Sequence, residues 1–388
     1  MAPPSEIILG IDLGTTYSTA AAVIDGRLHF ALDSRGEACI PSVVHFPSRG
    51  PPLVGIEGDR LRSTDPQNTV FGIKRLIGRS ADSPPARLLD ACSAFKIRNQ
   101  PGGEAAVQVR NGTYAASEIA AMILRHLREK AEARFGRKIT KTVLTVPVLA
   151  TDAIRAAMIK CGKMAGLEVT RIVSEPVAGA VARGFAGDDW GGEPVLVYDF
   201  GGGTFDAAVV RREQGALTVV ASGGDDCLGG DDFDLAFARW VADVVWRGHA
   251  VDVVKDAILW DRVQRQCEMV KRMLSKEEEG RFFIREAFGV GPKVQNLDYL
   301  VRRGNLSPHW SELVTRSMQT SYTTVHEAGL EVRELGAVLL IGGTTYVPQV
   351  RAAVTESFDL PIAIEDDPQT AVARGAALLA SQASLLAA

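Results

Sequence analysis

The chain repeats itself once, at an offset of close to half its 388 residues. Asp12, at the end of an apolar run, has its counterpart in Asp199, 187 residues later. Val143-Leu-Thr-Val-Pro147 matches Val338-Leu-Leu-Ile-Gly342 at an offset of 195, and Ala-Val-Ala-Arg-Gly occurs word for word at 180–184 and at 371–375. Three matched segments in one order, at nearly one spacing, predict two homologous lobes of about 185 residues, within the usual size range of a domain.

Each half carries the patterns of buried strands and amphipathic helices. Apolar runs that open into glycine and threonine are typical of a buried strand followed by a tight turn, and we expect a hairpin after each. Apolar residues at a spacing of three to four, with a capping residue before them, predict helices. The expected strands are Ile7–Asp12 and Val195–Phe200, and the expected helices lie within Thr113–Gly136, Thr151–Gly166 and Ser307–Gly329. The pattern predicts a mixed α/β fold.

The repeat also predicts where the chain divides. We expect lobe I at residues 1–190, lobe II at 191–366, and a C-terminal helix at 367–388 that returns to lobe I. Two stretches, about 41–112 and about 231–305, have no counterpart in the other half. They predict a subdomain inserted into each lobe.

Composition excludes several classes of partner. The 43 Lys and Arg against 47 Asp and Glu give a net charge of -4, so no whole-protein charge favours nucleic acid or an anionic membrane. No apolar stretch is long enough to span a bilayer, and the N-terminus lacks a signal pattern, which predicts a soluble, cytoplasmic protein. Five cysteines without a C-x-x-C pair predict neither a disulfide framework nor a zinc knuckle.

Two glycine and threonine loops, one in each half, are the strongest functional signal. Backbone N–H groups in such loops bind phosphate oxygens. Asp12 and Asp199 end the preceding strands, and Asp206 lies seven residues beyond Asp199. Facing lobes would bring these carboxylates together, where they would repel one another unless a divalent cation such as Mg²⁺ lay between them. One glycine run alone would as readily be a hairpin turn, but two at matched places favour a Mg-nucleoside phosphate in the cleft between the lobes.

At this point the motifs resemble a known family. They are Gly10-Ile-Asp-Leu-Gly-Thr-Thr-Tyr-Ser18, Lys74-Arg-Leu-Ile-Gly-Arg79, Val197-Tyr-Asp-Phe-Gly-Gly-Gly-Thr-Phe-Asp206, Leu228-Gly-Gly-Asp-Asp-Phe-Asp234 and Leu340-Ile-Gly-Gly-Thr344. As a set they resemble the ATPase domain of the heat-shock protein 70 (DnaK) chaperones, within the actin and sugar-kinase superfamily. The resemblance covers nearly the whole chain. It implies an α/β, actin-like ATPase fold with two duplicated ribonuclease H-like lobes and the nucleotide in the interlobe cleft.

The resemblance also implies roles for individual residues. Lys74 would reach the γ-phosphate and the attacking water, Glu175 would orient that water and relay the nucleotide state, and Thr204 with Asp206 would bond the γ-phosphate and complete the shell of the cation. The alternatives are a solvated surface lysine and an acid placed at a helix N-terminus. The implied metal ligands are Asp12, Asp199 and Asp206, and the implied cofactors are ATP or ADP with Mg²⁺, with K⁺ as a further candidate ion. The implied nucleotide ligands are Gly14, Thr15, Thr16, Tyr17, Gly201, Gly202, Gly203, Thr204, Gly230, Glu268, Lys271, Arg272, Ser275, Gly342, Gly343, Thr344, Tyr346 and Gln369.

The adenine base of the nucleotide would lie against one helix face. Glu268, Lys271, Arg272 and Ser275 fall at i, i+3, i+4 and i+7, so they project together, while an apolar stripe from Val263 to Leu274 faces the other way. For an isolated helix such a face is usually just solvated. The resemblance instead assigns it to adenosine, with the glycines at 342 and 343 allowing the ribose a close approach.

Three positions depart from the family pattern. Tyr346 stands where an arginine usually stacks on adenine, Gln369 stands where an acid is common, and Ser174 replaces an asparagine before Glu175. A tyrosine ring stacks without the cationic contribution, so a changed nucleotide affinity is expected. A nucleotide-sensing interaction module with little turnover is therefore one alternative to a slow ATPase, and a small-molecule kinase of the same superfamily is another.

The resemblance implies a J-domain co-chaperone and a nucleotide exchange factor as partners. Arg155 and Arg171 match the family pattern for the J-domain surface, whereas Ser174 and Val177 do not. The family's acidic, apolar linker and peptide-binding domain are not found in these 388 residues. The sequence leaves open whether the chain is an excised ATPase domain or a natural stand-alone homologue.

Overall fold

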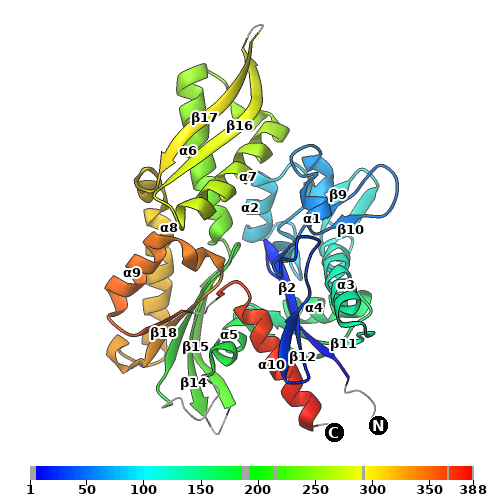
Figure 1. The fold of residues 1–388 in the computed structure, drawn as a ribbon, viewed down its shortest axis with the longest axis vertical. Helices are drawn as coiled ribbons and strands as arrows, with labels where there is room; N and C mark the ends of the chain where they lie inside the picture. The colour runs from blue at the N-terminus through cyan, green and yellow to red at the C-terminus, as the bar shows by residue number, and fades with distance from the viewer. Residues whose placement is uncertain (1–5, 186–191, 214–215, 291–292, 365–366, 387–388) are drawn as a thin grey trace.

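Two β-sheets with the same strand order form the framework of the computed structural model, which describes residues 6–185, 192–213, 216–290, 293–364 and 367–386 (Figure 1). The first sheet runs β12 (Glu168–Ser174), β11 (Lys141–Val146), β1 (Ile8–Asp12), β2 (Tyr17–Ile24) and β3 (Arg27–Phe30), with β4 (Ile40–Pro41) paired to β2. The second runs β19 (Ile362–Ile364), β18 (Ala337–Ile341), β13 (Val195–Phe200), β14 (Phe205–Glu213) and β15 (Ala216–Asp225). The internal repeat is therefore a repeat of topology.

The strand pairing places equivalent residues at equivalent points. In each sheet the central strand forms an antiparallel hairpin with the next strand and pairs in parallel with β11 or β18. Asp12 lies opposite Thr19 in the first hairpin, and Asp199 lies opposite Asp206 in the second. Both predicted strands and both predicted hairpins are thus confirmed.

Three helices recur at matching places around the two sheets. In the first half they are α3 (Ala116–Phe135), α4 (Asp152–Met164) and α5 (Glu175–Arg183), and in the second α8 (Arg303–Glu327), α9 (Pro348–Phe358) and α10 (Ala371–Leu386). Two helix predictions are confirmed: α3 ends at Gly136 in a left-handed conformation, and the Thr151 hydroxyl accepts a hydrogen bond from the backbone N–H of Ile154 at the start of α4.

The predicted start of the third helix is wrong. The sequence predicts Ser307 as the capping residue and Pro308 as the first residue of the helix, but α8 begins at Arg303 and Pro308 lies inside it. Two hydrogen bonds hold the first turn without the proline. The Asn305 side chain accepts a hydrogen bond from the backbone N–H of Arg302, and the Arg303 guanidinium donates one to the Leu274 carbonyl at 2.9 Å. Strand β17 therefore runs directly into the helix, and these contacts outweigh the local preference for proline in a first turn.

The two unmatched stretches contain further elements. In the first are β5 (Val44–His45), β6 (Leu53–Val54), α1 (Ile56–Asp59), η1 (Pro66–Asn68), β7 (Thr69–Val70), η2 (Ile73–Leu76), α2 (Pro84–Cys92), β8 (Lys96–Asn99), β9 (Ala105–Val109) and β10 (Gly112–Ala115). In the second are α6 (Gly230–His249), η3 (Val253–Lys255), α7 (Ala257–Leu274), β16 (Glu279–Val290) and β17 (Lys293–Arg302), and η4 (Val332–Glu334) and η5 (Gly343–Tyr346) follow α8 and β18. The lobe boundaries at residues 190 and 366 stay a prediction.

A buried apolar cluster joins the two halves around α5 and α10, which lie side by side between the sheets in Figure 1. It combines Val143 of β11, Ala178 of α5, Val197 of β13, Leu339 of β18 and Ala376 of α10. Helix α10 packs on α5, β1, β2 and β11, so the end of the chain returns to the first sheet. The repeated word Ala-Val-Ala-Arg-Gly is helical in both places, but its final glycine caps α5 at residue 184 and lies within α10 at residue 375.

Gly375 permits the closest helix contact in this interface, and its replacement is expected to be costly. A Cβ at Gly375 would lie 1.7 Å from the carbonyl oxygen of Ala178, so Gly375→Ala is expected to destabilise the protein by about 2–4 kcal/mol through forced separation of α5 and α10. Gly248→Ala is the matched control, because Gly248 lies in α6 with no atom within 4 Å of the new Cβ. Urea unfolding measures the free energy of unfolding of both variants. Gly248→Ala should be equal to the wild type in stability or about 0.5–1 kcal/mol more stable.

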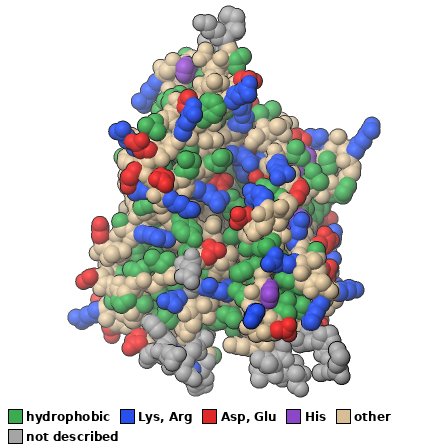
Figure 2. Space-filling view, viewed as in Figure 1, with side chains coloured by type: hydrophobic (Ala, Val, Ile, Leu, Met, Phe, Trp, Pro, Cys, Tyr) green, Lys and Arg blue, Asp and Glu red, His purple; other side chains and the backbone are tan. Residues whose placement is uncertain are grey.

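Charges are mixed over the face seen in Figure 2, where described Lys and Arg side chains alternate with Asp and Glu. Among the described residues, no helix combines the length and apolarity needed to cross a membrane.

Candidate functional site

A cavity of about 580 Å³ is walled by loops and helices from both halves of the chain. That volume is typical of small-molecule sites. Every residue predicted to bind nucleotide or metal, or to act in catalysis, lines this cavity except Asp206. The structure therefore brings together residues from β1, η2, α5, α7, η5 and the turn before α10, and the predicted ligands Asp12 and Gln369 are 357 positions apart.

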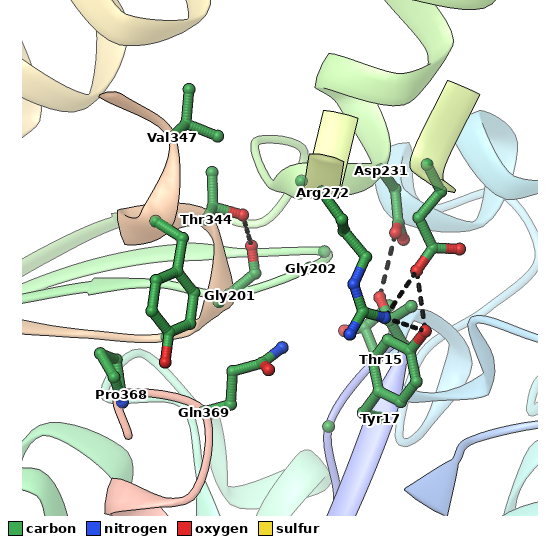
Figure 3. Close-up of a pocket in the computed structure, with 18 of the residues that line it drawn as sticks. Thr15, Tyr17, Gly201, Gly202, Asp231, Arg272, Thr344, Val347, Pro368 and Gln369 are labelled. Atoms are coloured by element: carbon green, nitrogen blue, oxygen red, sulfur yellow. Dashed lines mark hydrogen bonds and ion pairs between the residues drawn. The ribbon is translucent and has the colours of Figure 1, made fainter. Parts of the chain in front are cut away.

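The two glycine and threonine loops face each other and touch. A Cβ at Gly202 would lie 2.0 Å from Oγ1 of Thr16, and a Cβ at Gly203 would lie 2.4 Å from Cγ2 of Thr15. Glycine is needed here because any side chain would push the loops apart. The Thr344 hydroxyl, from η5, holds the second loop by donating to the Gly201 carbonyl at 2.8 Å, as Figure 3 shows.

Carboxylates gather around one ammonium at the inner end of the cavity. Nζ of Lys74 donates to Oε1 of Glu175 at 2.7 Å, and the side chains are 11% and 6% exposed, so Lys74 is not a solvated surface lysine. Oδ1 of Asp12 accepts a hydrogen bond from the Thr145 hydroxyl at 3.1 Å. Burial disfavours the Lys74 ammonium, but the carboxylates of Glu175 and Asp12 outweigh it and raise the Lys74 pKa.

The pKa values of these carboxyl groups are raised chiefly by burial, and the crowding of like charges around one cation adds to the shift. Burial raises the pKa of Glu175 to about 8, although Lys74 lowers it. Burial also raises the pKa of Asp199 well above its ordinary value, and the neighbouring Glu175, Asp206 and Asp12 add to the shift. Protonation of one acid removes a like charge from beside its neighbours, and ionisation of all of them would leave the site with excess negative charge.

Asp206 lies behind the cavity wall rather than on it. It faces Asp199 across the β13–β14 pair and is 4% exposed. Burial raises its pKa to about 6, while Lys74 and a hydrogen bond from Thr204 lower it. Its predicted contact with a ligand would therefore be less direct than that of Asp12 or Asp199.

The residues present fit a divalent cation by their charge. Three buried carboxyl groups, those of Glu175, Asp199 and Asp206, and the partly buried Asp12 surround the Lys74 ammonium. A dication with phosphate oxygens would balance their charge. Among the described residues, no group of three or more His, Cys, Asp or Glu side chains is arranged to hold a metal ion. A divalent cation at this place would therefore take most of its ligands from water and from the oxygens of a bound phosphate.

Helix α7 supplies the outer end of the cavity, as its spacing predicts. Glu268, Lys271, Arg272 and Ser275 all line it, while the apolar stripe from Val263 to Leu274 is buried. Lys271 is only 11% exposed, since its ammonium donates to Asp234 at 2.6 Å and to the Gly230 carbonyl at 2.7 Å. The alternative of a merely solvated helix face is therefore wrong for Lys271.

A hydrogen-bonded contact crosses the cavity between Tyr17 and α7. The Tyr17 hydroxyl donates to Oε1 of Glu268 at 2.8 Å and accepts from Arg272 at 3.0 Å, and Figure 3 shows the Arg272 side chain reaching over the Tyr17 ring. Burial and the neighbouring Glu268 raise the pKa of Tyr17. A ligand that uses these groups must replace the hydrogen bonds that they make with one another.

Tyr346, the main departure from the family pattern, is held from outside the cavity. Its hydroxyl donates to Oδ1 of Asp367 at 3.3 Å, and the Arg351 guanidinium lies 5.4 Å from its ring centre. The Gln369 amide lies close to Gly343, where a Cβ would be 2.7 Å from Nε2. The ring is thus fixed at the cavity wall with a cation behind it.

Sequence reasoning left seven wall residues unassigned. They are Asp231, Asp234, Met273, Lys276, Val347, Pro368 and Val372. Asp231 accepts a hydrogen bond from Thr16 at 3.0 Å and Asp234 pairs with Lys271, so both acids position predicted ligands. The sequence could have predicted a place at the site for Asp231 and Asp234, because both lie in the motif from Leu228 to Asp234.

A comparison with protein families agrees with this geometry. A family model described as Hsp70 protein matches residues 8–386. That match spans almost the whole chain and confirms the resemblance carried by the motifs: the chain belongs to the Hsp70 family of nucleotide-binding chaperones, which are generally ATPases, and it has the mixed α/β, actin-like ATPase fold of that family.

Proposed function

We propose that this chain binds Mg-ATP in the 580 Å³ cavity, hydrolyses it slowly to ADP and phosphate, and closes its two halves around the nucleotide. The observation that carries the proposal is the meeting of two glycine and threonine loops beside the Lys74–Glu175 ion pair. Backbone N–H groups of both loops would cradle the phosphates, and one buried ammonium would face the terminal phosphate.

Hydrolysis needs charge neutralisation and an oriented water. Lys74 would donate to a γ-phosphate oxygen, and Glu175, which holds the Lys74 ammonium at 2.7 Å, would fix its direction and accept a hydrogen bond from the water. The water oxygen bonds to the γ-phosphorus, the bond from that phosphorus to the β–γ bridging oxygen breaks, and ADP, inorganic phosphate and a proton are the products. Asp12, Asp199 and Asp206 would hold hydrated Mg²⁺, which would neutralise charge on the phosphate oxygens.

Different chemistry at the two ends of the interface supports closure. The halves share a buried apolar cluster around α5 and α10, but between α7 and the α1 segment they meet through ion pairs, Arg62 with Asp261 at 3.0 Å and Arg265 with Asp59 at 2.8 Å. The Arg265–Asp59 pair, whose side chains are 27% and 19% exposed, parts at lower cost than an apolar core, whereas the Arg62–Asp261 pair is more deeply buried. We therefore propose that the cleft opens at α7 and hinges near α5 and α10.

The proposal is tested by titrating the protein calorimetrically with ATP and with ADP, with and without Mg²⁺, and then by measuring phosphate release. Mg²⁺-dependent binding followed by acceptor-independent phosphate release supports the ATPase. Binding without phosphate release would favour the nucleotide-sensing module, and ATP consumption only with an added acceptor would favour the kinase.

Tyr346 is the observation that favours the sensing alternative, and it yields a prediction. Tyr346→Arg is expected to tighten ADP binding about 2-fold to 30-fold, because a guanidinium over the base adds a cation–π contribution of about 0.5–2 kcal/mol. The matched control is Tyr346→Phe, which keeps the ring, loses the hydrogen bond to Asp367, and should bind ADP within about twofold of the wild type. Calorimetry that found Tyr346→Arg no tighter than Tyr346→Phe would contradict this assignment.

We also propose a J-domain co-chaperone and a nucleotide exchange factor as partners. Arg171 is exposed on β12, and Arg155 at the start of α4 donates to the Ala150 carbonyl at 3.2 Å. Two arginines near one edge of the first sheet suit an acidic partner surface.

A further inference from the structure

A second, small cavity of about 30 Å³ adjoins the inner end of the nucleotide cavity. The two cavities share Thr15, Lys74 and Thr204, which therefore form the partition between them. The rest of its wall comes from Arg75, Ile77, Arg79, Pro85, Thr145, Val146, Pro147, Ile154, Met158 and Asp226. None of these ten residues lines the nucleotide cavity, so the small cavity lies on the far side of Lys74 and Thr204, which are proposed to contact the γ-phosphate, and of the nucleotide ligand Thr15.

An ion pair between the two halves closes this cavity toward the surface. Arg79, from the first half, donates to Oδ2 of Asp226, from the second half, at 2.7 Å, and the side chains are 22% and 37% exposed. Arg75 is more deeply buried, at 5%, and donates to the Asp226 carbonyl at 3.3 Å and to Asp232 at 3.5 Å. The wall thus runs from a buried lysine through a buried arginine to an arginine that reaches solvent.

One donor on this wall is unused. Nε of Arg79 is buried and has no hydrogen-bond partner among the residues that the structure describes. A guanidinium matches the geometry of a phosphate through two parallel N–H donors, and Arg75 places a second guanidinium nearby. Three cations in series, Lys74, Arg75 and Arg79, suit a small oxyanion rather than a neutral or cationic ligand.

The position of the cavity suits the departing phosphate. In an in-line displacement the attacking water and the leaving ADP lie on opposite sides of the γ-phosphorus. ADP would remain in the large cavity after cleavage, so a phosphate formed at Lys74 and Thr204 would have ADP on one side and the small cavity on the other. At about 30 Å³ the small cavity has room for a water but not for phosphate, so passage requires the Arg79–Asp226 pair to part.

We propose that this cavity is a transient site for inorganic phosphate and its route out of the protein, with the Arg79–Asp226 ion pair as its outer gate. The inference rests on the proposed hydrolysis and deepens it. A partly exposed ion pair contributes little net stability, so the gate parts at low cost while ADP stays bound. Phosphate would consequently leave before ADP and independently of it.

The test measures three rates in one turnover of the full chain: bond cleavage by acid quench, free phosphate with a fluorescent phosphate-binding sensor, and release of a fluorescent ADP. Asp226→Asn keeps both arginines but removes the negative charge that holds Arg79, and should speed phosphate release at least about 3-fold relative to cleavage. Ile154→Phe places a ring in the cavity from a partly buried position on α4, and should slow phosphate release at least about 3-fold with cleavage unchanged.

The matched control is Asp261→Asn, which breaks another ion pair between the halves, with Arg62, away from the small cavity. It should change ADP release and leave phosphate release as fast as in the wild type. Phosphate release that follows ADP release in all four proteins, with cleavage intact, would overturn the phosphate route alone. Absence of cleavage in the wild type would overturn the proposed hydrolysis and the route with it.

Discussion

Lys74→Ala is expected to lower the single-turnover rate of phosphate formation by about 100-fold to 1,000-fold at saturating Mg-ATP, while the protein stays folded. Removing one buried, charged donor from a developing oxyanion usually costs that much. Lys74 is the cation that the structure pairs with Glu175 at 2.7 Å at the inner end of the cavity. Rapid quench of a single turnover measures the rate, and circular dichroism checks the fold.

The sharpest control for this prediction is Lys271→Ala. Both lysines line the cavity, both side chains are 11% exposed, and both pair with a carboxylate, Lys271 with Asp234 at 2.6 Å. They differ in place, since Lys271 lies at the outer end on α7. Lys271→Ala should therefore weaken nucleotide binding and leave the saturated single-turnover rate within about 3-fold of the wild type.

A second variant separates the loss of catalysis from the loss of stability caused by an unpaired buried charge. Lys74→Ala leaves Glu175 buried without its partner, which by itself costs stability. Lys74→Ala combined with Glu175→Gln removes both charges and should fold at least as well as the single variant, with equally slow hydrolysis. Full single-turnover activity in either variant would remove Lys74 from the proposed mechanism.

The sequence alone predicted the parts of this site that depend on local pattern. A strand that opens into glycines constrains the backbone directly, so the loops after Asp12 and Asp199 were predictable, and the structure places them in contact. The face of α7 was predictable because side chains at i, i+3, i+4 and i+7 must project together. Duplication then predicted that the loops face each other, since equivalent strands occupy equivalent places in two similar sheets.

Contacts between distant polar side chains were not predictable. Tyr17 meets Glu268 across 251 positions, and neither residue differs in local pattern from a solvated one. The small cavity likewise depends on Arg79 meeting Asp226 across 147 positions. The predicted start of α8 was wrong for a related reason. Pro308 favours a helix whose capping residue is Ser307, but the contacts of Arg303 with Leu274 and Glu278 place the first turn earlier.

Asp199→Asn is expected to stabilise the nucleotide-free protein and to abolish most of the stabilisation by Mg-ATP. Asp199 is 7% exposed, and burial together with Glu175, Asp206 and Asp12 raises its pKa. An asparagine of the same shape removes one of the crowded charges, which should raise the free energy of unfolding by about 1–3 kcal/mol and the Tm by a few degrees. Thermal unfolding with and without Mg-ATP measures both effects.

The stability of the nucleotide-free protein should depend on pH, and the sign of that dependence follows from the raised pKa values. A carboxyl group whose pKa is raised in the folded state keeps its proton there at pH values where the unfolded chain has lost it. Its contribution to stability is therefore largest below the ordinary aspartate pKa of about 4 and is lost as the pH rises through the folded-state value. The Tm of the nucleotide-free wild type should fall between about pH 5 and pH 8, and that of Asp199→Asn should fall less.

Asp261→Asn provides the opposite case among buried aspartates. Asp261 is 4% exposed, but its charge is compensated by Arg62 at 3.0 Å. Its replacement should lower the free energy of unfolding by about 1–3 kcal/mol and leave the response to Mg-ATP largely intact. If both variants destabilise the nucleotide-free protein equally, Asp199 is compensated in a way that the Lys74 ammonium alone does not explain, and the need for a divalent cation at this point of the cleft disappears.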